Sequence, residues 1–196
     1  MNIILASNSP RRKELLSGID IPYTINVLPD IDESYPETLP HEEVAEYLAR
    51  KKAAAYLPNL QDNTLLITAD TTVLLHDKIL EKPIDKTDAK QMLRLLSGET
   101  HRVITGVCLT TKSIQRSFSA VAFVTFGELS DKEIDYYVEK CNPMDKAGAY
   151  GVQEWIGYVA VKHIEGSYFN IMGLPIYEVY RELVDGFGMK INSNSF

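Results

Sequence analysis

Short apolar runs alternate with amphipathic segments along the whole chain, and this order constrains the fold more than any other feature. Residues 3–6 and 65–69 are apolar over the length of a strand, whereas residues 41–56 carry apolar side chains at helical spacing with lysines on the other side. Strands that alternate with helices are typical of the α/β class. We therefore predict an α/β fold with a twisted sheet flanked by helices.

The remaining elements are predicted from the same patterns and from the turn residues between them. Pro10 suits the first turn of a helix, and Ser130 with Glu133 forms a capping-box pattern at the start of another. Residues 102–111 and 117–126 alternate as an antiparallel pair, so we expect a mixed sheet. Predicted strands occupy residues 3–6, 23–28, 65–69, 73–75, 79–80, 102–111, 117–126 and 158–164, and predicted helices occupy 11–16, 41–56, 88–96, 131–140 and 174–184.

The length and charge of the chain limit what it can be. Its 196 residues suit one domain, which we place at residues 1–187, followed by a polar tail at 188–196. The net charge of -7 argues against non-specific binding to duplex DNA, which needs a basic face. No apolar run reaches the roughly 20 residues that cross a bilayer, and Cys108 and Cys141 form no metal-binding pair. We therefore expect a cytoplasmic protein that binds neither nucleic acid nor membrane.

The first strand, loop and helix carry a candidate anion site. Ser7 and Ser9 lie in the loop before Pro10, and Arg11 and Arg12 follow it. Free backbone N–H groups and the positive end of a helix dipole favour an anion there, and arginine can hold a phosphate with two hydrogen bonds. The alternative is an ordinary capped helix start with its arginines in solvent.

Acidic and basic residues elsewhere are candidates to complete such a site. Asp70 follows the apolar run at 65–69, so we expect it at the carboxyl end of a buried strand, where α/β proteins bind ligands. A turn residue is the alternative for Asp70. Glu33 lies in an acidic cluster that equally fits a solvated loop. Lys52 and Lys82 are candidate cations, although lysine is mostly a surface residue.

The common nucleotide-binding fingerprints are missing from the sequence. It contains no P-loop pattern, no GxGxxG and no HExxH. Because it has no Cys/His cluster either, a metal would be held by hard oxygen ligands, which suit Mg²⁺ or Mn²⁺. These residues alone indicate an α/β protein with a candidate phosphate site.

Taken together and in order, the segments resemble the Maf family of nucleoside triphosphate pyrophosphatases. The resemblance runs from Leu5 to about Val184, and the number of matching segments makes it specific. The matching segments are ASNSPRR at 6–12, DE at 32–33, LARKKA at 48–53, ADT at 69–71, EKP at 81–83, LSG at 96–98 with His101, TGV at 105–107, DKAGAYGVQ at 145–153, GSYFN at 166–170 and GLP at 173–175.

The resemblance implies a fold similar to that of the inosine triphosphate pyrophosphatases, with two lobes around a deep cleft. It also implies cleavage between the α- and β-phosphates, a divalent cation (Mg²⁺ or Mn²⁺), a cytoplasmic location and a homodimer. Asp70 matches the family's catalytic acid, and Glu33 and Asp70 are the expected metal ligands. The residues expected to bind the substrate are Ser7, Ser9, Arg12, Lys52, Lys82 and Gln153.

The family divides by substrate, and Arg12, Lys82 and Gln153 resemble the group that acts on dTTP and UTP. An amide such as Gln153 can offer both a donor and an acceptor to the edge of a pyrimidine. Modified pyrimidine nucleotides are therefore further candidate substrates. Glu154 and Thr68 depart from the family pattern, since glycine is common at both positions, and Glu154 bears on base selectivity. Two alternatives stay open: a 7-methyl-GTP pyrophosphatase, and a nucleotide-binding regulator of cell division that hydrolyses little.

Two aromatic side chains, Trp155 and Tyr168, are further candidates for the site. Either ring could stack on a bound base, because a base presents an apolar face to an aromatic ring. Core packing is the competing interpretation for both residues.

Overall fold

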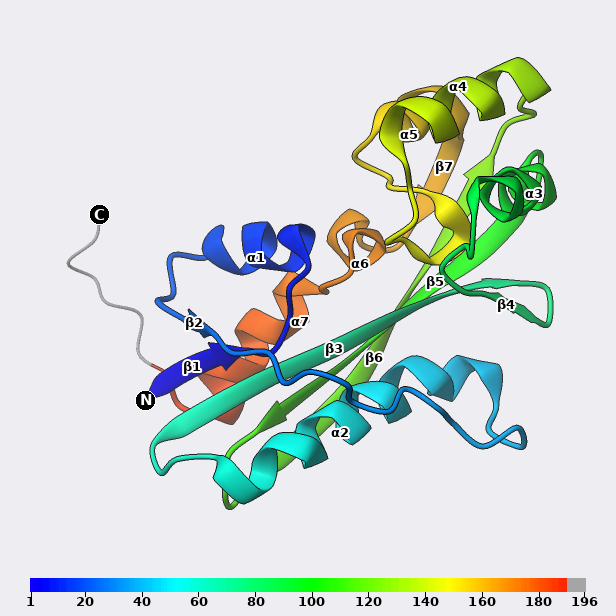
Figure 1. Cartoon of the computed structure of the whole chain (residues 1–196). Coiled ribbons are helices and arrows are strands. Elements are labelled where there is room, and N and C mark those ends of the chain that lie inside the picture. The colour runs from blue at the N-terminus through cyan, green and yellow to red at the C-terminus, as the bar shows by residue number, and fades with distance from the viewer. Residues whose placement is uncertain (190–196) are drawn as a thin grey trace.

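The computed structural model describes residues 1–189 and is built on one seven-stranded mixed sheet (Figure 1). The strands follow the order β2-β1-β3-β5-β6-β7, and β4 pairs with the end of β3. β1 pairs in parallel with β2 and β3, and the other pairs are antiparallel. The strands are β1 (Asn2–Leu5), β2 (Thr24–Ile25), β3 (Thr64–Leu75), β4 (Lys78–Leu80), β5 (Thr100–Thr110), β6 (Gln115–Phe126) and β7 (Val161–Glu165).

Helices cover both faces of this sheet. In Figure 1, α2 lies along one face of the long strands, and α1, α6 and α7 lie on the other. The pair α3 and α4, together with α5, gathers at the far end of the sheet beside β4 and β7, so the three long strands join two lobes. The helices are α1 (Pro10–Ser17), α2 (Val44–Tyr56), α3 (Lys86–Leu96), α4 (Asp131–Cys141), α5 (Trp155–Ala160), α6 (Tyr168–Met172) and α7 (Ile176–Arg181).

Each face of the sheet has its own apolar core. On the α2 face, Ala49 and Ala53 pack with Leu66 of β3 and Cys108 of β5. The larger core on the opposite face runs through both lobes. Burial of this apolar surface is the main favourable contribution to folding. The larger core includes Leu5, Leu16, Leu65, Ile67, Leu93, Val107, Phe126, Tyr137, Val179 and Leu183.

Several sequence predictions are confirmed in detail. Ser9 caps α1, with Pro10 as the first helical residue. Ser130 and Glu133 form the predicted capping box at the start of α4. β5 and β6 pair as an antiparallel hairpin, and β3 and β4 form the second predicted hairpin.

We predicted Asp70 at the carboxyl end of a strand, and this prediction is wrong. β3 continues from Thr64 to Leu75 without a break, and Asp70 pairs opposite Gly106 of β5. The polar residues at 70–72 imitate the end of a strand in the sequence. They fit inside β3 because Asp70 and Thr71 face a pocket rather than the core.

The other corrections concern short elements. Residues 158–160 belong to α5 and not to a strand, because a continuous apolar run fits helix and strand equally well. Residues 168–172, for which we predicted no helix, form α6, capped by Ser167. β2 covers only Thr24–Ile25 of the predicted 23–28. The last helix starts at Ile176, two residues after the predicted start, and continues beyond Arg181 as a π-helix, Glu182–Gly186.

Two further predictions concern the ends and the surroundings of the chain. The polar tail predicted at 188–196 lies outside the described residues from position 190 onward. Within residues 1–189, no helix combines the length and the apolar character that crossing a membrane requires.

The contact between α2 and β5 at Gly106 leads to a stability prediction. A Cβ atom at this glycine would lie 2.2 Å from the backbone nitrogen of Glu46 and 2.3 Å from the carbonyl carbon of Ala45. Neither backbone atom can move without shifting α2. We expect Gly106→Ala to lower the free energy of unfolding by at least the ~1–3 kcal/mol typical of overpacking. Urea unfolding followed by circular dichroism measures this.

The control for that measurement is Gly18→Ala, at the end of α1. A Cβ atom there would lie no closer than 3.4 Å to its nearest neighbour, and φ is already -68°. Gly18→Ala should leave the unfolding midpoint almost unchanged. Equal stability of the two variants would contradict the close approach of α2 to β5.

Candidate active site

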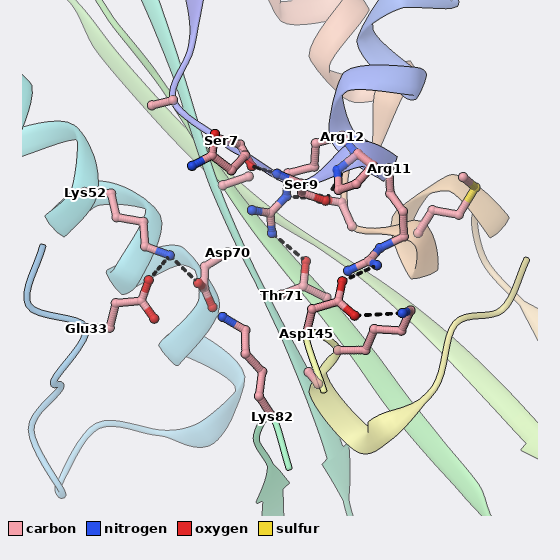
Figure 2. Close-up of a pocket in the computed structure, with 18 of the residues that line it drawn as sticks. Ser7, Ser9, Arg11, Arg12, Glu33, Lys52, Asp70, Thr71, Lys82 and Asp145 are labelled. Atoms are coloured by element: carbon pink, nitrogen blue, oxygen red, sulfur yellow. Dashed lines mark hydrogen bonds and ion pairs between the residues drawn. The ribbon is translucent and has the colours of Figure 1, made fainter. Parts of the chain in front are cut away.

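One pocket of about 540 Å³ lies between the two lobes and collects side chains from distant parts of the chain (Figure 2). Its wall is formed by the loop after β1, the start of α1, the middle of β3, α2 and the segment around residue 150. A volume of this size suits a nucleotide-sized ligand. All the residues that the sequence singled out for binding, catalysis or metal ligation line it: Ser7, Ser9, Arg12, Glu33, Lys52, Asp70, Lys82 and Gln153.

The loop between β1 and α1 forms one wall of the pocket. Ser7 is buried, and its hydroxyl accepts a hydrogen bond of 3.2 Å from the backbone N–H of Ser9. The Ser9 hydroxyl in turn accepts from the backbone N–H of Arg12. The loop therefore places hydroxyl groups and the positive end of α1 at the pocket, as the candidate anion site required.

The guanidinium of Arg12 is held in place by the protein on one side. Its Nε donates to the carbonyl of Gly173 at 2.7 Å, and one Nη donates to the Thr71 hydroxyl at 3.1 Å. Thr71 lies 2.9 Å from the Thr105 hydroxyl, which donates to the carbonyl of Asn170. Since arginine only donates, this chain has one direction, with Thr71 donating to Thr105. Burial lowers the pKa of Arg12, and the charge of Asp70 opposes this effect.

Lys52 lies between two carboxylates. Its Nζ is 2.6 Å from Oδ1 of Asp70 and 2.8 Å from Oε1 of Glu33, as Figure 2 shows. The Lys52 and Asp70 side chains are largely buried, at 15% and 16% exposed, whereas Glu33 is half exposed. The ammonium of Lys52 therefore compensates the negative charge at the point where α2 faces β3.

The charges around the pocket set the pKa of Glu33. Partial burial alone would raise this pKa, but the hydrogen bond and charge of Lys52, with smaller contributions from Lys82 and Arg12, lower it below its ordinary value of 4.5. Glu33 is therefore ionised at neutral pH.

Lys82 reaches the pocket from the segment after β4. Figure 2 shows its amine directed toward Asp70. Among residues 1–189 it forms no ion pair with a carboxylate, unlike Lys52. Its charge is thus available to a bound anion.

Another part of the pocket wall is formed by the segment that contains Gln153. The side-chain carbonyl Oε1 of Gln153 is buried and has no hydrogen-bond partner among the described residues. Buried polar atoms are normally paired, so this oxygen is positioned to accept a hydrogen bond from a ligand.

Tyr150 also forms part of the pocket wall, although no local pattern singles it out in the sequence. Its hydroxyl lies 2.7 Å from Nε2 of His101, and both rings pack edge-on against Phe126. Burial lowers the pKa of His101 to about 4, so the imidazole is neutral at neutral pH. His101 therefore supports this wall as an uncharged residue.

Arg11, the second arginine of the candidate anion site, also lines the pocket. Asp145 and Lys146 line it as well, although the segment at 145–151 reads in the sequence only as a glycine-bearing turn. Conversely, neither Trp155 nor Tyr168 lines the pocket. The Trp155 ring packs on Tyr136 and the Tyr168 ring on Phe169, so neither serves as the stacking platform that we considered.

The pocket contains two carboxylates that could hold a divalent cation, Glu33 and Asp70. No group of three or more His, Cys, Asp or Glu side chains within residues 1–189 is arranged to bind a metal. Mg²⁺ commonly takes one or two protein carboxylates and completes its shell with water and phosphate oxygens. The donor set therefore fits a cation that binds together with a phosphorylated ligand.

The mixed α/β fold and this cation-lined pocket are suited to a small phosphorylated ligand. The chain belongs to the Maf family: the model described as "Maf-like protein" matches residues 2–185.

Two relatives and one solved structure show how far this similarity extends. The chain is 61% identical over 181 residues to a dTTP/UTP pyrophosphatase of Phocaeicola vulgatus, covering 92% of this chain and 94% of that protein. It is 60% identical, over the same shares of the two chains, to a dTTP/UTP pyrophosphatase of Bacteroides thetaiotaomicron. The structure of the Staphylococcus aureus Ham1 protein covers 95% of this chain and all of its own, with a TM-score of 0.55 at 14% identity, and confirms the predicted fold class.

The position of Lys52 leads to a prediction for Glu33. In Lys52→Met the partial burial of Glu33 remains while the largest opposing interaction is lost, so the pKa of Glu33 should rise. Carbon-detected NMR titration of the glutamate carboxyl groups measures it. Because the wild-type pKa is lowered, ionised Glu33 stabilises the fold at neutral pH, and this contribution is lost as the pH falls through that pKa.

Lys51→Met is the matched control for that titration. Lys51 is the neighbouring residue on α2, but its Nζ bonds Asp32 at 2.7 Å and lies outside the main pocket. The pKa of Glu33 should stay the same in this variant. A pKa of Glu33 that is unchanged in Lys52→Met would contradict the bridging position of Lys52.

Proposed function

We propose that this chain hydrolyses dTTP and UTP, with modified pyrimidine nucleotides as further substrates, to the nucleoside monophosphate and pyrophosphate. The observation that carries the proposal is one pocket that is lined both by cations and carboxylates and by an amide whose buried oxygen has no partner among the described residues. Membership of the Maf family and the names of the close relatives support the same substrates.

The cationic end suits the triphosphate. A nucleoside triphosphate repels an incoming nucleophile, so catalysis rests on positioning and on neutralising phosphate charge. Arg12 is fixed by Gly173 and Thr71 with part of its guanidinium still free to donate. We place the β- and γ-phosphates against Arg12 and Lys82, with the hydroxyl groups of Ser7 and Ser9 and the start of α1 beside them.

Asp70 is the residue that we assign to the chemistry. Asp70 lies in the middle of β3, so the strand supports its carboxylate rigidly, and the hydrogen bond from Lys52 orients that carboxylate. A carboxylate so placed can orient the attacking water and accept its proton. Attack at the α-phosphate releases pyrophosphate, which the neighbouring cations stabilise.

Glu33 and Asp70 are the residues that would hold a divalent cation, Mg²⁺ or Mn²⁺. When bound, such a cation neutralises charge on the phosphate oxygens. In the free protein Lys52 already compensates both carboxylates. We propose that Lys52 pairs with the phosphates of the bound nucleotide.

Gln153 suits the recognition of a pyrimidine base. Thymine and uracil present an N–H donor flanked by two carbonyl acceptors, and an amide offers the complementary acceptor and donor. The buried, unpartnered Oε1 of Gln153 is such an acceptor. We place the reaction in the cytoplasm, a reducing compartment that suits the free thiols of Cys108 and Cys141, and keep a homodimer as a proposal.

The proposal is tested by the products of dTTP incubated with Mg²⁺. Chromatography should show dTMP and pyrophosphate, and excess chelator should abolish both. Asp70→Asn, with folding verified by circular dichroism, should lose about 10²-fold or more in kcat, as expected for removal of a general base.

Three outcomes of that assay, when it is run with dTTP, UTP and 7-methyl-GTP, would contradict the proposal. Formation of dTDP and orthophosphate would change the reaction class. Faster hydrolysis of 7-methyl-GTP than of dTTP and UTP would change the substrate. Tight binding of dTTP without turnover would favour a nucleotide-binding regulator.

A further inference from the structure

A chain of ion pairs runs beneath the end of the pocket that contains Gln153. Arg11 donates to Oδ2 of Asp145 at 3.0 Å, and Oδ1 of Asp145 lies 2.7 Å from Nζ of Lys146. The same Nζ lies 3.0 Å from Oε1 of Glu154. The chain of charges thus links the start of α1 to the residue directly after Gln153.

Glu154 is also tied to the backbone of the pocket wall. Its Oε2 accepts a hydrogen bond from the Tyr137 hydroxyl, and that hydroxyl oxygen accepts from the backbone N–H of Gly151 at 3.1 Å. The backbone N–H of Glu154 donates to the carbonyl of Gly151 at 2.9 Å. Glu154 is thus connected to the backbone of Gly151 in two ways, directly through its own N–H and indirectly through the Tyr137 hydroxyl.

The loop leaves no room for a side chain at Gly151. A Cβ atom at Gly151 would lie 2.9 Å from the carboxyl carbon of Glu154 and 3.1 Å from Cε of Lys146. The carboxylate of Glu154 therefore lies directly against the backbone that precedes Gln153.

The burial of these charges makes their pairing important. The Lys146 side chain is only 8% exposed and that of Glu154 is 23% exposed. A buried charge is tolerated when it is paired. Removal of one partner leaves the other charge buried and uncompensated, which destabilises the fold. Lys146 lines the pocket, and two carboxylates compensate its charge.

Gln153 and Glu154 face different environments. Gln153 lines the pocket, whereas the Glu154 carboxylate is directed to Lys146 and Tyr137 and does not line it. Because Oε1 of Gln153 has no partner of its own among the described residues, the direction of its amide depends on how the backbone of its neighbours is held.

We propose that Glu154 is a positioning residue that sets the Gln153 amide for the nucleobase. The proposal rests on the proposed function, since it concerns the base end of the same pocket. Glu154 acts through Lys146 and through the Tyr137 hydroxyl, and it makes no direct contact with the proposed phosphate ligands Arg12 and Lys82. The glutamate at this position, a departure from the family pattern, thus fixes base selectivity in this chain rather than weakening it.

The test compares a ligand that has a base with one that has none. Isothermal titration calorimetry, in metal-free buffer, gives the Kd of dTTP and of inorganic tripolyphosphate for the wild type and for Glu154→Gln. The variant keeps the size of the side chain and loses its charge. We expect dTTP to bind about 10- to 150-fold more weakly, the range for a lost hydrogen bond to a charged group. Tripolyphosphate should bind within about 2-fold of the wild type, because Glu154 contacts neither Arg12 nor Lys82.

Two further variants complete the design. Tyr137→Phe removes only the hydroxyl between Glu154 and the Gly151 backbone, so it should show the same pattern in a weaker form. Glu128→Gln changes an exposed glutamate that pairs with no lysine or arginine among residues 1–189, and it should change neither Kd. Thermal unfolding of every variant shows that each is folded at the temperature of the titration.

The outcomes separate this proposal from the proposed function. Equal losses for dTTP and tripolyphosphate, or no loss for either, in both Glu154→Gln and Tyr137→Phe would overturn the positioning role. Equal binding of dTTP and tripolyphosphate by the wild type would also overturn it, because no base would then be recognised. Selective weakening of dTTP supports it even if the wild type fails to release pyrophosphate, a failure that would contradict the proposed function alone.

Discussion

The ammonium of Lys52 lies between Asp70 and Glu33, and the geometry of the site depends on this arrangement. Carboxylates in a half-buried pocket repel each other and lose hydration, so they need a cation within hydrogen-bonding distance. Lys52 can supply it because α2 approaches β5 closely at Gly106, where any side chain would meet the helix backbone. One helix contact therefore fixes where the reactive carboxylate, its counter-ion and the acidic loop meet.

The same sheet supports both ends of the pocket, but each end is organised by different interactions. At the phosphate end, a directional chain of hydrogen bonds through Thr71 and Thr105 holds Arg12, which leaves part of its guanidinium for a ligand. At the base end, a set of buried charges around Lys146 holds the backbone next to Gln153. In the function that we propose, this arrangement lets the site bind triphosphates through charge and select among them by the hydrogen bonds of one amide.

Local sequence signals predicted much of this structure, and long-range contacts set the limit. The caps at Ser9 and Ser130 and the hairpin of β5 and β6 depend on near neighbours, so the sequence contains them in full. The site residues were found through motifs whose joint presence is specific to a family. The place of Asp70 in the middle of β3 was missed because polar residues inside a strand resemble its end. The ion pairs of Lys146 with Asp145 and Glu154 were missed as well. These two carboxylates are held in place from other elements, by Arg11 and by the Tyr137 hydroxyl.

The central claim is that one pocket holds a pyrimidine nucleoside triphosphate in a single orientation. A crystal structure with the non-hydrolysable α,β-methylene analogue of dTTP and Mg²⁺ tests it most directly. The account predicts the β- and γ-phosphates against Arg12 and Lys82, the α-phosphate near Asp70, and the thymine edge on the Gln153 amide. Phosphates bound along the segment 145–153, or a base that makes no contact with Gln153, would contradict it.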